Sequence, residues 1–219
     1  YNGLDLEIGY LSLVIESSKN PKLMPGKTGN FDCSQFVTAL EKPLTVDRSM
    51  GDVHPLGNPH YHYSPSNITR VARGMARLLA DADKDNAGFY EANYKTFAEH
   101  LNEKEKAWHE IPLKGKKFVA YHEYFEYLAA EFGFWFIGYL EPKPGIPPSA
   151  AHVQELIGNM KTEKPDAILV TPAYGMQEAE ALSAKTGVKV IVLPHDVGSM
   201  PGTDDMLSFW NKVIASLKQ

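Results

Sequence analysis

The amino-acid sequence predicts an α/β protein with a parallel sheet in its C-terminal half. From Lys116 onward, short apolar runs alternate with helical segments, a rhythm typical of parallel sheets covered by helices on both faces. The 219 residues are 43% hydrophobic and 22% charged, as is usual for globular proteins. This length suits one large domain or two modest lobes.

The strands and helices of the C-terminal half can be assigned from their residue types. Strands are short runs rich in β-branched and aromatic residues, bounded by turn residues. They are expected at 117–121, 134–140, 167–171 and 188–193. Helices are expected at 123–132, 149–164, 176–186 and 204–217, with Ser149 as an N-cap and Gly187 closing the third.

The N-terminal half is expected to contain helices and turns. Apolar residues at helical spacing predict a helix within 4–17, and a short helix is expected at 34–40. Ser66 is expected to cap the next helix. A longer helix follows, whose narrow apolar stripe runs from Tyr90 to Trp108 between charged faces, a pattern typical of a surface helix or a bridge between lobes.

Composition excludes several classes of function. The net charge of −5, from 22 basic and 27 acidic residues, argues against a nucleic-acid partner, because such surfaces need a basic patch. Cys33 is the only cysteine, so an intrachain disulfide and a thiolate zinc site are excluded. No apolar run approaches the ~18 residues of a membrane span. The chain opens at Tyr1 without an initiator Met, and we interpret it as a mature or truncated form.

Candidate metal ligands follow two of the expected strands. His122 comes directly after the strand at 117–121, and His195 and Asp196 come shortly after the strand at 188–193. Proteins with open parallel sheets bind small molecules and ions beyond the carboxyl ends of the strands. These residues are therefore expected at one edge of the sheet. Taken singly, each is also an ordinary polar loop residue.

A loop rich in Pro and Gly, residues 54–62, supplies a further candidate. Its stiff backbone suits a preorganised site, and His60 beside Pro59 is the expected ligand. His54 and His62 are expected as supporting or surface residues. The sequence contains no glycine-rich phosphate loop, nucleophile elbow or two-histidine helical zinc motif.

These segments together resemble the zinc and manganese solute-binding proteins of ABC transporters over essentially the whole chain. Residues 57–61 (GNPHY) are similar to the most specific metal-binding element of that family, and residues 121–127 (YHEYFEY) to another. The resemblance implies that His60 and His122 bind the metal. A histidine at position 122 is more typical of the zinc members, whereas manganese members tend to have Glu there.

The resemblance also implies a ligand after the last strand and an architecture. The ligand is His195 when counted back from Gly198, or Asp196 when judged by residue type. The architecture is two α/β lobes with parallel sheets joined by a long linking helix, with the N-terminal lobe incomplete. The lobes are expected at 1–84 and 112–219 and the linking helix at 85–111, with a first histidine ligand upstream of Tyr1.

The function that the resemblance implies is zinc capture outside the cytoplasm and delivery to the membrane permease of an ABC transporter. The protein would be periplasmic or extracytoplasmic, attached to the membrane only through a lipid anchor upstream of this chain, and would not be an enzyme. One alternative is the same fold binding manganese or iron. Another is a metal-dependent hydrolase with an open zinc site, in which Glu123 activates a water.

The chemistry of a histidine-rich site leads to two more expectations. Each imidazole ligand needs an acceptor for its other ring nitrogen, and Glu123, Asp52 and Asp196 are the candidates. Only neutral imidazole binds a metal, so zinc affinity is expected to fall as the pH drops below ~6.5.

Overall fold

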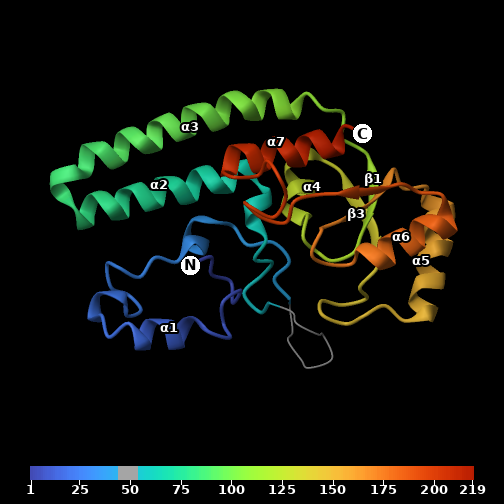
Figure 1. Ribbon diagram of the computed structural model, residues 1–219, viewed down its shortest axis with the longest axis horizontal. Coiled ribbons are helices and arrows are strands. Elements are labelled where there is room, and N and C mark those ends of the chain that lie inside the picture. Colours follow the sequence, from blue (N-terminus) through green and yellow to red (C-terminus); the bar gives the residue numbers. More distant parts are fainter. Residues whose placement is uncertain (44–53) are drawn as a thin grey trace. The chain divides into compact units, whose positions relative to one another are not determined.

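The computed structural model describes residues 1–43 and 54–219, which form two compact units (Figure 1). The first unit contains described residues 1–43 and 54–106, and the second contains residues 107–219. The boundary falls inside the long helix α3 (Ala87–His109). The sheet lies in the second unit, and the regular elements described in the first are helical.

The first unit starts with a segment that is less helical than the sequence predicts. The helix α1 (Leu11–Ser17) begins well after the expected start, and turns precede it. Leu4 and Asp5 have φ angles of 54° and 63°, which a right-handed helix cannot accommodate. The short helix expected at 34–40 is a single 3₁₀ turn, Cys33–Phe36. Further 3₁₀ turns cover Pro21–Leu23, Tyr61–Tyr63 and Lys84–Asn86.

The helix α2 (Pro65–Ala82) is capped by a different serine from the one expected. Ser64 is in an extended conformation, and its side chain accepts a hydrogen bond from the Asn67 amide at 3.2 Å. Pro65 occupies the first helical position, where the missing N–H has no cost. The prediction that Ser66 is the N-cap is therefore wrong, because Ser66 already lies in the first turn.

The second unit contains the predicted parallel sheet. The strands β1 (Lys117–Ala120), β2 (Trp135–Tyr139), β3 (Ala167–Val170) and β4 (Val190–Val192) pair in the order β2-β1-β3-β4, all parallel. In this register Ala120 of β1 is opposite Tyr139 of β2 and Leu169 of β3. The carboxyl ends of these three strands are therefore in line.

Helices cover both faces of this sheet, as predicted (Figure 1). The helices α5 (Ala150–Glu163) and α6 (Met176–Thr186) pack on one face, against alternate strand residues such as Val119 and Ile168. The helices α4 (Glu126–Phe132) and α7 (Met206–Leu217) pack on the other. No described helix is both long enough and apolar enough to cross a membrane.

Aromatic residues pack together on the face of the sheet that α7 covers. Trp108 and Trp210 stack with ring centroids 5.5 Å apart, and Phe132 stacks on Trp210 at 6.2 Å. The indole N–H of Trp108 donates to Asn211 Oδ1 at 3.1 Å. Aromatic pairs of this kind add to the stability that burial alone provides.

Candidate metal site

His122 lies just beyond the carboxyl end of β1, as the sequence predicts. The preceding residue, Tyr121, still pairs with the sheet, because its amide donates to Leu169 O at 3.1 Å. The half-buried His122 ring lies 4.5 Å from the Tyr124 ring, and its Nδ1 lies 2.6 Å from Glu141 Oε2. The strand end thus holds the imidazole in a defined orientation.

Glu141 is a site residue that sequence reasoning missed. It follows β2, is only 4% exposed, and its amide donates to Tyr121 O at 2.9 Å. The acceptor at His122 Nδ1 is thus Glu141 and not one of the expected candidates, of which Asp52 lies outside the described residues. The strand-end rule that indicates His122 applies equally to Glu141, but a glutamate in a loop has no local signal that distinguishes it from an ordinary surface residue.

Three tyrosines surround this carboxylate. The hydrogen bond to Glu141 and burial both raise the pKa of Tyr174, whose hydroxyl donates to Glu141 Oε1 at 2.7 Å. Burial and the Glu141 charge also raise the pKa values of Tyr121 and Tyr124. At neutral pH these phenols are protonated, so the Tyr174 hydroxyl acts as the hydrogen-bond donor to Glu141.

His195 and Asp196 follow β4 and differ in their surroundings. His195 is half-buried, whereas Asp196 is exposed and its Oδ1 accepts a hydrogen bond from the Val197 amide at 2.7 Å. The Ser199 hydroxyl donates to Asp196 O at 2.6 Å, which closes a tight turn. Within the described part of the second unit, the ligand atoms of His122, His195 and Asp196 do not all lie within 4.8 Å of one another.

His60 belongs to the first unit, in the loop that the sequence marks as preorganised. Asn58 is 7% exposed; its Oδ1 accepts from the His60 amide at 2.9 Å, and its side-chain amide donates to Glu41 at 2.9 Å. Gly57 has a φ of 115°, and a Cβ there would lie 2.8 Å from Leu40 O. The loop therefore requires Gly-Asn just ahead of Pro59 and His60.

The two other histidines of this loop are neighbours of His60. The rings of His54 and His62 meet the His60 ring edge-on, with centroid distances of 6.5 and 6.3 Å. All three are half-buried. His54 and His62 therefore both lie beside His60, and whether they support it stays a prediction.

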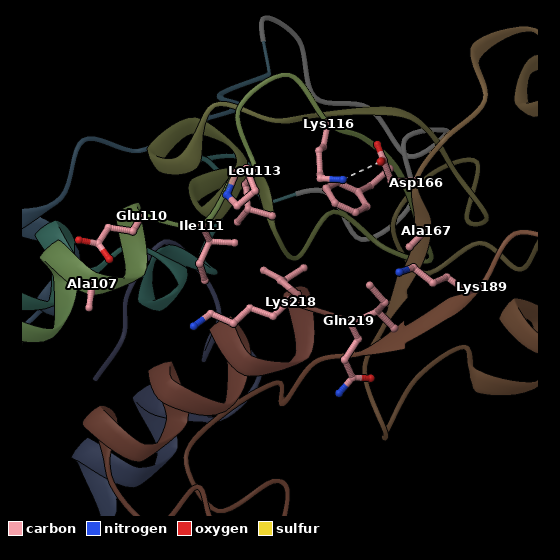
Figure 2. Close-up of a pocket in the computed structure, with 14 residues that line it drawn as sticks. Ala107, Glu110, Ile111, Leu113, Lys116, Asp166, Ala167, Lys189, Lys218 and Gln219 are labelled. Carbon is pink, nitrogen blue, oxygen red and sulfur yellow. Dashed lines mark hydrogen bonds and ion pairs between the residues drawn. The ribbon is translucent and has the colours of Figure 1, made fainter.

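The second unit also contains a cavity of about 580 Å³, whose lining residues are drawn in Figure 2. Lys116, Asp166 and Lys189 line it, and each directly precedes a strand. Lys116 is paired with Asp166 at 2.8 Å. Because this cavity lies at the amino ends of the strands and none of the candidate ligands lines it, it is separate from the metal site.

The fold defines a class of protein. A crystal structure of ZnuA aligns with a TM-score of 0.75, covering 99% of this chain and 77% of that one, at 23% sequence identity. The chain belongs to the family described as zinc-uptake complex component A, periplasmic, whose model matches residues 1–219. The predicted family and fold class are thereby confirmed, and the family consists of solute-binding transport proteins and not of enzymes.

Two curated relatives of this chain are described by different metals. The high-affinity zinc uptake system protein ZnuA of Brucella abortus is 27% identical over 135 residues, which is 59% of this chain and 40% of that protein. The iron-binding protein YfeA of Yersinia pestis is 27% identical over 164 residues, 71% of this chain and 51% of that protein. The matched segments thus span only about half of each relative or less.

Proposed function

We propose that this chain binds zinc outside the cytoplasm and passes it, as cargo, to the membrane permease of an ABC transporter. The observation that carries the proposal is His122, held at the carboxyl end of β1 with its Nδ1 against the buried Glu141. Membership in a zinc-uptake family supports zinc as the cargo and the extracytoplasmic location. Imidazole ligands, with or without a carboxylate, suit tetrahedral zinc.

The proposed ligands are His60, His122 and one residue of the turn after β4. For the third position we favour His195, because the Asp196 carboxylate already bonds its own turn through the Val197 amide. Tetrahedral zinc takes four ligands, so a fourth protein ligand beside these three would leave no open position for hydrolysis.

The ligand assignment is tested by zinc stoichiometry and affinity. Equilibrium dialysis of the unaltered chain should give about one zinc per molecule, with the affinity measured by chelator competition. The double variant His60→Ala, His122→Ala should lose this binding. His100→Ala is the matched control, because His100 is an exposed residue on α3 and should leave affinity unchanged. Full affinity in the double variant would rule out both ligands.

The choice between His195 and Asp196 needs separate single variants. If His195 is the ligand, His195→Ala should weaken zinc binding strongly, while Asp196→Ala should have a small effect through the turn. The reverse pattern would assign the metal to Asp196. Each variant needs a thermal unfolding curve without metal, because Asp196 also stabilises local backbone.

A different cargo is the second candidate function. The Yersinia pestis relative is described as iron-binding, which favours testing iron, and manganese is the other metal that the family resemblance suggests. Affinity order alone does not decide which metal a protein carries in the cell. A competition titration with zinc, manganese and ferrous iron would decide, and manganese or iron displacing zinc at equal concentration would overturn the zinc assignment. Delivery is tested by zinc uptake into vesicles that contain the permease, with and without this protein.

A further inference from the structure

The buried carboxylate of Glu141 forms the centre of a hydrogen-bond chain that reaches three strand ends. Glu141 follows β2, its amide is bonded to Tyr121 O at the end of β1, and its carboxylate contacts Tyr174, which follows β3. Oε2 faces His122 Nδ1 at 2.6 Å, and Oε1 accepts from the Tyr174 hydroxyl at 2.7 Å. Both carboxylate oxygens are therefore engaged, in a residue that is only 4% exposed.

This arrangement sets the tautomer of His122. An ionised carboxylate only accepts hydrogen bonds, so the neutral imidazole must carry its proton on Nδ1. The lone pair of the ring is then on Nε2, which becomes the atom that can bind a metal. The negative charge of Glu141 also makes the imidazole a better electron donor, as carboxylate partners of zinc-bound histidines do in general.

Tyr174 keeps the Glu141 carboxylate in this orientation. Its ring meets the Tyr121 ring edge-on at 5.0 Å and the His122 ring at 6.1 Å. The next residue, Gly175, has a φ of 84°, and a Cβ there would lie 2.1 Å from the Tyr121 ring. The turn after β3 thus packs directly against the Tyr121 ring. This contact orients the Tyr174 hydroxyl toward Glu141. Without that hydroxyl, one carboxylate oxygen would be buried without its donor and the group could rotate.

We propose that Glu141 and Tyr174 are positioning residues that hold His122 with Nε2 directed to the metal and thereby strengthen zinc binding. The proposal rests on the proposed function, because it takes His122 as a zinc ligand. Neither residue contacts the metal in this scheme. Loss of such a supporting group typically weakens metal affinity about 10- to 100-fold.

The test uses two variants and a matched control in the full chain. Glu141→Gln keeps the shape of the side chain but removes its charge, and Tyr174→Phe removes only the hydroxyl of a residue that is 40% exposed. Tyr90→Phe is the control, since the Tyr90 hydroxyl donates to Asp83 on the surface of the other unit. For each protein we would measure zinc affinity by chelator competition, unfolding without metal, and the His122 tautomer by nitrogen-15 NMR at about pH 8.

The expected results separate a positioning role from a structural one. Glu141→Gln should bind zinc about 10- to 100-fold more weakly and Tyr174→Phe should show a smaller loss, with Tyr90→Phe unchanged. Metal-free His122 should be protonated at Nδ1 in the unaltered protein and should populate both tautomers in Glu141→Gln. Unchanged zinc affinity together with lowered stability would overturn the proposal. If the unaltered protein did not bind zinc, the proposed function would fail. Independently of zinc binding, a single His122 tautomer that persisted in Glu141→Gln would refute the positioning role.

Discussion

Gly175 shows how closely a single residue is packed beside the candidate metal site. We expect Gly175→Ala to lower the free energy of unfolding by about 3 kcal/mol or more, since a positive φ and a clash with Tyr121 both oppose the new side chain. Gly187→Ala is the control, because Gly187 has a φ of 74° with open space around it and should cost only about 1 kcal/mol. Urea denaturation measures both. Equal losses would mean that the contact with Tyr121 is unimportant.

Asp166 gives the stability of the second unit a dependence on pH. Burial by itself raises the pKa of Asp166, but hydrogen bonds from Lys116 Nζ at 2.8 Å and the Lys117 amide at 3.0 Å outweigh it, so the pKa is lowered. The folded state therefore favours the ionised form. The resulting stability is complete above the unfolded-state pKa of ~3.9 and is lost as the pH falls through the lower folded-state pKa.

The measurement compares Asp166→Asn with the unaltered chain by denaturant unfolding between about pH 7 and pH 2. Both side chains of the pair are more than a third exposed, so we expect a difference of less than about 1 kcal/mol at neutral pH. This difference should shrink in acid and in high salt. A difference that grows as the pH falls would contradict the assignment.

Sequence reasoning placed His122 correctly at the end of β1 but overlooked its neighbour Glu141, for a physical reason. A histidine after a strand stands out because few residue types bind transition metals. A glutamate after a strand usually faces solvent, whereas Glu141 is buried and hydrogen-bonded to Tyr121 and Tyr174, which follow other strands. That burial depends on segments far apart in the sequence, so the residues next to Glu141 in the sequence could not predict it.

At the scale of elements, the start of α2 offers a direct test of which serine caps the helix. Ser64→Ala should destabilise the first unit by about 1 kcal/mol, because the Asn67 amide would lose its acceptor. Ser66→Ala should change stability by less than about 0.5 kcal/mol, because Ser66 is an exposed residue of the first turn. Thermal or urea unfolding distinguishes the two. A larger loss in Ser66→Ala would restore the cap that the sequence suggests.

Elements with strong local signals were predicted best. The helix α6 begins at Met176 and ends at Thr186 as expected, because Gly187 stops it with a left-handed conformation. The helix expected within 4–17 was predicted too long, since apolar spacing says nothing about the positive φ angles of Leu4 and Asp5. Local chemistry thus determines helix ends where a cap is present, and tertiary contacts determine them elsewhere.

At the scale of the whole molecule, the second unit can be tested apart from the first, which contains His60. We expect a fragment of residues 103–219, which keeps a helical turn ahead of Trp108, to fold, because its sheet and aromatic cluster are internal to the second unit. It should bind zinc much more weakly than the full chain, since it lacks His60. Near-ultraviolet circular dichroism and chelator competition measure the two properties. Equal affinity in fragment and full chain would show that the first unit supplies no ligand.

The position of α7 in the chain has a consequence for synthesis on the ribosome. Phe209, Trp210, Val213 and Ile214 are at most 2% exposed and cover the face of the sheet opposite α5 and α6. This cover is made after all four strands. Until residues 206–217 have left the ribosomal exit tunnel, a nascent chain leaves the part of that face under α7 uncovered, and a chaperone that binds apolar segments would find its target there.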